Sequence, residues 1–308
     1  MNIQIRLGVL LALLIQVHQV KSDDFLTNMS DAGIEIRKTF KGSAKDQASP
    51  ASFNMSGASG SDNYYNIDLA VKVSEYVFDF NRTSLWKGRL YPSVEFHRNT
   101  NEQSEADNMQ GAISFEFERG LGACAKLKNP FCKAMIIDTS FKVKRDSHND
   151  KTTQSASVFG TFSGANKSNW PGRTIVFGDS AFKLIYLPFI GAEYHRNLPI
   201  EEKVDGEKVE IAGSIDEYFA VARLNVGLYP FAKSLDEKLK LVFDYSYRST
   251  IGSNDLIDNS NTFTDVSLDY YLDEKNRIAL GFSYSNGQSP SRNFLDEEKW
   301  GIGFKLKL

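Results

Sequence analysis

The chain ends in Trp300-Gly301-Ile302-Gly303-Phe304-Lys305-Leu306-Lys307-Leu308, where a bulky apolar residue occupies every second position. A β-strand turns successive side chains to opposite faces, so one face of this stretch would be apolar and the other would carry Gly and Lys. In water, an exposed terminal strand with a wholly apolar face would promote aggregation. The lipid-facing surface of a membrane barrel requires this pattern. The stretch therefore predicts a membrane-embedded β-strand.

A chain that ends on such a strand resembles the Gram-negative outer-membrane proteins, whose C-terminal strand is an assembly signal. That signal usually closes on Phe, and Leu308 departs from it. The resemblance implies a location in the outer membrane of a Gram-negative bacterium. It also implies three partners: outer-membrane lipid, lipopolysaccharide, and the outer-membrane assembly machinery, which would bind the C-terminal strand.

Residues 1–22 have the features of a secretory signal peptide. A short basic start precedes the apolar run Leu7–Val17, which is too short to span a bilayer as a helix. Val20-Lys21-Ser22 provides small or modest residues for signal peptidase, so we expect cleavage before Asp23. The alternative is an N-terminal anchor helix. No other stretch approaches the roughly 18 consecutive apolar residues of a transmembrane helix.

Composition limits the class of partner. The 22 residues to be removed contain two basic residues, Arg6 and Lys21, and no acidic ones. The mature chain therefore has 34 basic and 39 acidic residues and a net charge of −5, which argues against a nucleic-acid partner. The mean hydropathy of −0.35 is compatible with a membrane barrel, because only one residue in two faces lipid.

From Tyr64 onward the period-2 alternation recurs at regular spacing, which predicts an all-β protein. Alternating runs occupy residues 67–73, 90–97, 113–118, 135–144, 154–163, 182–194, 218–228, 239–247, 266–272, 278–284 and 300–308. A β-sandwich is the alternative, because it also buries one face of each strand. Runs of about 10–14 residues with Tyr or Trp near their ends favour a single antiparallel transmembrane β-barrel.

We expect about 12 strands, in a barrel over 63–308 that follows a polar N-terminal segment, 23–62, with a possible first strand. The short turns 232–236 and 273–276 would be periplasmic, and the long polar segments 196–214, 248–261 and 286–298 extracellular. Two assignments give 12 strands. One begins with 32–41 and makes 164–181 a periplasmic connection; the other omits 32–41 and makes Thr174–Gly178 a strand.

Cys124 and Cys132 are the two cysteines of the chain, and they lie in one connection. In an exported protein we expect them to form a disulfide across the Asn129-Pro130 turn. The first strand assignment places this connection in the periplasm, and the second places it outside the cell.

Inward-facing positions carry charges of both signs, which is typical of a polar barrel interior. The predicted pore-lining residues are Arg223, Lys238, Lys240, Asp244, Glu116 and Glu118. We expect a narrow passive channel for small hydrophilic solutes, in which Arg223, Lys238 and Lys240 form a basic patch. A filled, non-conducting barrel with a structural or surface-interaction role is the alternative. His97 and His195, each followed by Arg-Asn, are expected at the rim.

One motif raises an enzymatic alternative. Ser283-Tyr284-Ser285-Asn286-Gly287 resembles the His-x-Ser-Asn-Gly segment of outer-membrane phospholipases, which also use 12-stranded barrels. A nucleophilic Ser needs a neighbouring base, and the place of that His is taken by Ser283. Asn-Gly is equally common where a strand enters a loop. We therefore expect no catalytic residue, no metal site, no cofactor and no enzymatic activity.

Overall fold

The computed structural model describes part of the chain. The described residues are 34–40, 50–57, 64–73, 75–79, 86–100, 106–119, 133–147, 151–164, 171–178, 181–198, 200–204, 207–212, 214–253, 260–274, 276–289 and 295–306. The predicted signal peptide, Cys124 and Cys132 lie outside them. None of the described residues belongs to a helix of the length and apolar character needed to cross a membrane.

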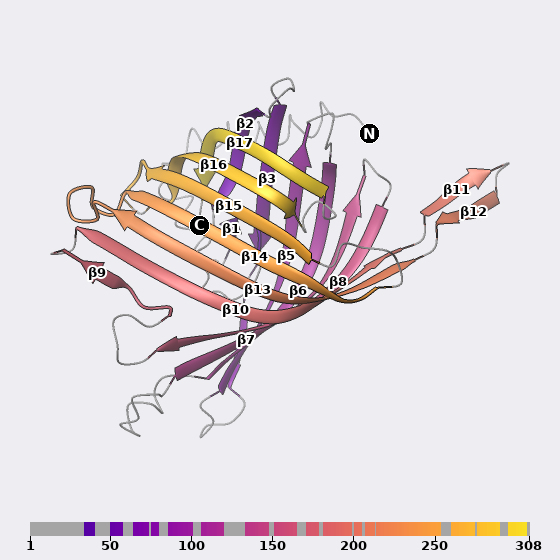
Figure 1. Ribbon diagram of the computed structural model, residues 1–308, viewed down its shortest axis with the longest axis horizontal. Coiled ribbons are helices and arrows are strands. Elements are labelled where there is room, and N and C mark those ends of the chain that lie inside the picture. The colour runs from indigo at the N-terminus through magenta and orange to yellow at the C-terminus, as the bar shows by residue number, and fades with distance from the viewer. Residues whose placement is uncertain are drawn as a thin grey trace.

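Twelve antiparallel strands form a closed barrel (Figure 1). The wall strands are β2 (Ala51–Gly57), β3 (Tyr64–Lys72), β5 (Trp86–Asn99), β6 (Ala106–Arg119), β7 (Lys133–Asp146), β8 (Lys151–Gly164), β10 (Phe182–Asn197), β13 (Ile215–Pro230), β14 (Leu239–Ser253), β15 (Ser260–Tyr271), β16 (Ile278–Ser289) and β17 (Leu295–Leu306). The last strand, β17, pairs with the first wall strand, β2, and closes the ring. Closure matters in lipid because every backbone N–H and C=O must find a partner within the protein.

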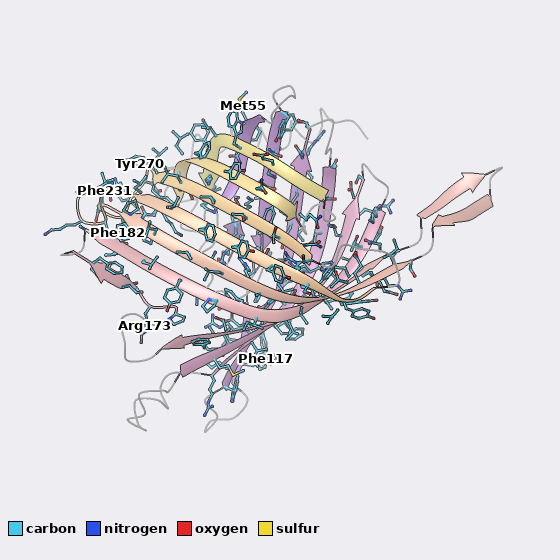
Figure 2. The ribbon with its side chains drawn as sticks, in the orientation of Figure 1. Met55, Phe117, Arg173, Phe182, Phe231 and Tyr270 are labelled. Atoms are coloured by element: carbon cyan, nitrogen blue, oxygen red, sulfur yellow. The ribbon has the colours of Figure 1, made fainter. Side chains whose placement is uncertain are left out.

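The side chains of the wall are arranged inside out relative to a soluble protein. Ile190, on the outer face of β10, is 76% exposed, whereas Glu116 on β6 and Asp269 on β15 are fully buried on the inner face. Figure 2 shows Met55 and Tyr270 on the outside of the barrel. The alternation read from the sequence assigns Ile190, Glu116, Asp269 and Tyr270 to the same faces, and the predicted fold class, a transmembrane antiparallel β-barrel, is confirmed.

The first wall strand is a correction to both sequence-based assignments. Neither 32–41 nor Thr174–Gly178 contributes a wall strand; the wall begins with Ala51–Gly57, inside the segment 23–62. This strand was missed because Ser, Asn and Gly dominate it, and Phe53 and Met55 are its only large apolar residues. The alternation is present but short, and pairing with β17 and β3 decides its place.

Three short strands pair with the protruding ends of wall strands, at the end of the barrel where β17 stops. They are β1 (Glu35–Arg37), β4 (Tyr76–Asp79) and β9 (Ile175–Phe177). Each pairs with the part of a wall strand that its longer neighbour does not reach: β1 with β3, β4 with β5, and β9 with β10. Unpaired edges would leave backbone polar groups without partners, and the short strands supply those partners.

The connections between strands lie at the two ends of the barrel. The turns 231–238 and 272–277 lie at the end where β17 finishes opposite the start of β2. The hairpin of β11 (Ile200–Val204) and β12 (Glu207–Ala212) projects from the opposite end (Figure 1). The three segments expected as long loops are partly strand, since 196–214 contains β11 and β12, β14 continues to Ser253, and β16 continues to Ser289. Backbone pairing extends beyond the apolar part of these hairpins.

The turn between β15 and β16 is held by Asp273. Its carboxylate accepts hydrogen bonds from the backbone N–H groups of Arg277 at 2.7 Å and Ile278 at 2.8 Å, and from Arg277 Nε at 3.0 Å. Asn276 supplies the left-handed residue of the turn, with φ of 54°, a conformation that Asn tolerates well. Partial burial acts to raise the pKa of Asp273, but the hydrogen bonds from Ile278 and Arg277 outweigh it and lower the pKa.

Candidate functional site

The barrel interior contains a polar cavity of about 90 Å³, enough for several water molecules. It lies toward the end that carries the β11–β12 hairpin, because its lining residues come from the corresponding halves of β7, β8 and β10. Its charged and titratable lining residues are Glu95, Lys142, Lys144, Glu193, His195, Arg223, Asp244 and Arg248. Ser and Thr side chains fill much of the space between them. The cavity is therefore the candidate solute site.

One wall of the cavity consists of ion pairs between neighbouring strands. Arg223 on β13 donates two hydrogen bonds to the carboxylate of Asp244 on β14, at 2.8 and 2.6 Å. Arg248 on β14 donates in the same way to Glu193 on β10, at 2.7 and 3.2 Å, and so reaches across β13. Two-point contacts between guanidinium and carboxylate groups are strong and fix orientation. These charges are thus largely neutralised in pairs.

The facing wall is organised around Glu95 on β5. Its carboxylate lies 3.6 Å from Lys142 Nζ and 3.2 Å from His97 Nε2. The other ring nitrogen of His97 lies 2.8 Å from a carboxylate oxygen of Asp68 on β3. His97 is 4% exposed and lies inside the lumen, so its place is in the charged network of the interior. His195 occupies a similar position on β10, 3.3 Å from Glu193.

The structure divides five of the six predicted pore-lining residues among three places inside the barrel. Arg223 and Asp244 line the cavity together as an ion pair. Glu116 and Glu118 on β6 lie near Arg89, at 3.8 and 3.4 Å. Lys240 is buried on the inner face of β14, with its Nζ 5.7 Å from the centre of the Tyr229 ring.

The predicted basic patch is not assembled. Lys238 lies in the turn between β13 and β14, outside the wall strands. Lys240 is four residues from Asp244 along β14, a separation of about 13 Å in an extended strand. The spacing in the sequence placed these cations on adjacent strands but did not show how far apart they lie along the barrel axis.

Sequence reasoning missed an apolar cluster inside the barrel. Phe159 on β8, Leu187 and Phe189 on β10, and Phe219 and Val221 on β13 are buried together. Gly191 makes room for it, since a Cβ on this residue would lie 2.6 Å from the Phe159 ring. The cluster fills one side of the lumen beside the cavity. The alternation did assign these residues to the inner face, and their apolar character was the available signal.

Residues Lys38–Phe40 also lie inside the barrel, where Thr39 contributes to the cavity lining and Phe40 is buried. The stretch 32–41 has the sequence pattern of a wall strand, because Ile34, Ile36 and Phe40 occupy alternating positions. Lys38 lies between Ile36 and Phe40 in this alternation, at a position that would face lipid if the strand continued. This interruption was the available signal that the strand ends at Arg37.

The phospholipase-like motif is oriented away from lipid. Ser285 is 3% exposed and lies on the inner face of β16, opposite Asp265 of β15. The resemblance would require a nucleophile on the lipid-facing surface, where substrate acyl chains lie. Gly287 has a φ of 103°, so the Asn-Gly pair marks a backbone irregularity near the end of the strand. Among the described residues, no group of three or more His, Cys, Asp or Glu side chains could hold a metal ion.

Comparison with known proteins gives structural likenesses at low sequence identity. No protein-family model matches the chain, and no curated protein sequence matches it. The NanC porin has 12% identity and a TM-score of 0.40, over 84% of this chain and 98% of that one. The KdgM porin in complex with disordered oligogalacturonate has 10% identity and a TM-score of 0.38, with the same two coverages.

The translocator domain of the autotransporter NalP from Neisseria meningitidis is a likeness of another kind. It has 10% identity and a TM-score of 0.35, over 96% of this chain and 97% of that one. These values do not single out one kind of barrel as a relative.

Proposed function

We propose that this outer-membrane β-barrel is a narrow channel through which small hydrophilic solutes diffuse passively. The observation that carries the proposal is the polar cavity, lined by paired charges of both signs, within a wall whose outer face is apolar. A lumen of this kind stays hydrated, because ion pairs and hydroxyl groups retain water that an apolar lumen would expel. A barrel of twelve strands is intermediate between small filled barrels and wide porins.

The paired charges support low selectivity. Arg223 and Arg248 are each matched by a carboxylate within the cavity wall, so neither presents an uncompensated charge to a passing ion. We expect solute size to limit passage more strongly than solute charge.

A non-conducting barrel with a structural or surface-interaction role is the second candidate. The observation that favours it is the segment Lys38–Phe40, which lies inside the lumen. Acidic residues of the hairpin at the far end, Glu201 and Glu202, would in that case bind divalent cations between lipopolysaccharide head groups. In either case the C-terminal strand would engage the assembly machinery.

Planar-bilayer recording distinguishes the two candidates. The mature protein is refolded in detergent, and folding is verified by heat-modifiable migration on gels. Discrete conductance steps from folded protein, with swelling of protein-containing liposomes in small sugars but not in large ones, are expected of a narrow channel. Folded protein that gives neither steps nor swelling would favour the non-conducting barrel.

Catalysis is not part of the proposal, because Ser285 lies on the inner face and Ser283 cannot act as a base. Release of fatty acid from phospholipid by the purified protein, lost in Ser285→Ala, would contradict this view.

A further inference from the structure

The N-terminal segment leaves the barrel wall at Arg37. Glu35, Ile36 and Arg37 of β1 pair with Lys72, Val71 and Ala70 of β3. Further along the same edge of β3, Ser52 of β2 pairs with Asp68. β1 and β2 are therefore two pieces of one edge, with β1 nearer the end where β17 finishes. Lys38, Thr39 and Phe40 do not continue along that edge, because their partners lie on distant wall strands.

These three residues contact opposite sides of the lumen. Lys38 Nζ donates a hydrogen bond to Asp265 of β15 at 2.6 Å. At the other side, the Phe40 carbonyl accepts a hydrogen bond from Lys142 Nζ of β7 at 2.9 Å. Around the ring, β15 and β7 are separated by β14, β13, β10 and β8 on one side, so they face each other across the barrel. The Lys38 side chain, the short backbone from Lys38 to Phe40 and the Lys142 side chain together therefore cross the lumen.

Glu95 holds the middle of this crossing. One carboxylate oxygen accepts a hydrogen bond from Thr39 Oγ1 at 2.6 Å, and the other accepts one from the Phe40 backbone N–H at 3.1 Å. Lys142 Nζ and His97 Nε2 approach the same carboxylate. A charged acceptor shared by the wall and the crossing segment makes the attachment strong while its charge persists.

We infer that Lys38–Phe40 is a strap that closes the lumen, and that Glu95 is the latch whose release opens it. The inference rests on the proposed channel function and supplies its regulation. Thr39 lines the cavity, so the strap forms a boundary of the space a solute would occupy. Phe40, the next residue of the strap, is 6% exposed and adds a large apolar side chain beside Thr39.

The contacts described above suit a movable element. In each of them, a side chain of the wall or of the strap provides one of the two partners, and β-ladder pairing of the segment ends at Arg37. Such contacts can be exchanged for water without opening the wall ladder, whereas removal of a wall strand would expose unpaired backbone to lipid.

The test compares the full mature protein with three variants in planar bilayers. Glu95→Gln removes the charge of the latch but keeps its size. A second variant replaces Lys38-Thr39-Phe40 with Gly-Ser-Gly, which removes the strap contacts but keeps the chain length. The matched control is Glu237→Gln, a carboxylate in the turn 231–238 that contacts Lys183 instead of the strap. Amide hydrogen exchange of residues 38–40 is measured in parallel.

We expect Glu95→Gln to raise the time-averaged conductance severalfold and to accelerate amide exchange at Phe40, with a larger effect from Gly-Ser-Gly and none from Glu237→Gln. Unchanged exchange and conductance in Glu95→Gln would overturn the latch. A wild-type conductance that Gly-Ser-Gly does not alter would overturn the strap. Faster exchange in Glu95→Gln without conductance in any folded variant would instead overturn the channel function and leave the latch standing.

Discussion

At the scale of single residues, Gly303 permits the closure of the barrel. It pairs with Asn54 across the β17–β2 seam, where a Cβ would lie 1.9 Å from the Phe53 carbonyl oxygen and 2.5 Å from Asn54 Oδ1. Backbone cannot yield as a flexible side chain can, so the seam requires the absence of a side chain here.

We therefore expect Gly303→Ala to lower the free energy of unfolding by about 1–3 kcal/mol. The measurement is urea unfolding in lipid vesicles, followed by tryptophan fluorescence. Gly111→Ala is the matched control, since a Cβ on Gly111 would meet nothing within 4 Å. Equal stability of the two variants would show that the seam relaxes to accept a methyl group.

Asp273 gives a residue-scale prediction with a pH dependence. Its pKa in the folded protein lies below the ordinary value of 3.8. The stabilisation it provides is therefore complete above that value and is lost as the pH falls through the lower folded pKa. We expect Asp273→Asn to destabilise the barrel by about 1 kcal/mol at pH 7, with a difference from wild type that shrinks below pH 4.

The control for Asp273 is Glu274→Gln in the same turn, because Glu274 is exposed. Urea titrations of all three proteins at neutral and acid pH supply the comparison. A deficit of Asp273→Asn that persists unchanged in acid would mean that the carboxylate charge does not hold the turn.

At the scale of elements, pairs of neighbouring strands decide which charges face the cavity. Arg223 on β13 and Asp244 on β14 neutralise each other. In Arg223→Gln, the Asp244 carboxylate would remain as a negative charge beside the path. We expect the cation-to-anion permeability ratio to rise by roughly twofold or more, read from the reversal potential in a salt gradient.

Lys240→Gln is the comparison for this pair, because Lys240 lies on the same strand but outside the cavity lining. It should leave the reversal potential nearly unchanged. Equal shifts of the reversal potential in the two variants would show that Lys240 lines the conducting path and would support the basic patch expected from the sequence.

At the scale of the whole molecule, the ring of twelve strands fixes the side of every connection. The connection 120–132 joins β6 to β7 at the end where β17 finishes and where the turns 231–238 and 272–277 lie. If this end faces the periplasm, we predict that Cys124 and Cys132, which lie outside the described residues, are periplasmic, as in the first of the two sequence-based assignments. Their disulfide remains a prediction, and it would add about 2–3 kcal/mol at most.

Two labelling experiments check this arrangement. Alkylation of unreduced, denatured protein should find neither cysteine free. An amine reagent that cannot cross membranes should modify Lys203 and Lys208 of the β11–β12 hairpin on intact cells, but Lys126 and Lys128 only after the outer membrane is opened. Labelling of Lys126 from outside would reverse the orientation of the barrel.

The local pattern of residues was enough to predict most of the β-strands that form the barrel wall. Alternation with a period of two follows from backbone geometry, so each alternating run revealed both a strand and its lipid-facing side without knowledge of its neighbours. The runs around Ile113, Phe243 and Ile302 illustrate this, since each lies in a wall strand with these side chains outward. The signal weakened where apolar residues were few, and Ala51–Gly57 was overlooked for that reason.

Only the tertiary structure decided what lies inside. The partners in the lumen are far apart in the chain: Lys38 and Asp265 are 227 residues apart, and Arg248 and Glu193 are 55 residues apart. Such contacts depend on closure of the ring and on the register between neighbouring strands. The two-residue alternation within one strand carries no information about either. The sequence by itself therefore determined which side chains point inward, and closure of the barrel decided which of them meet and that Lys38–Phe40 crosses between them.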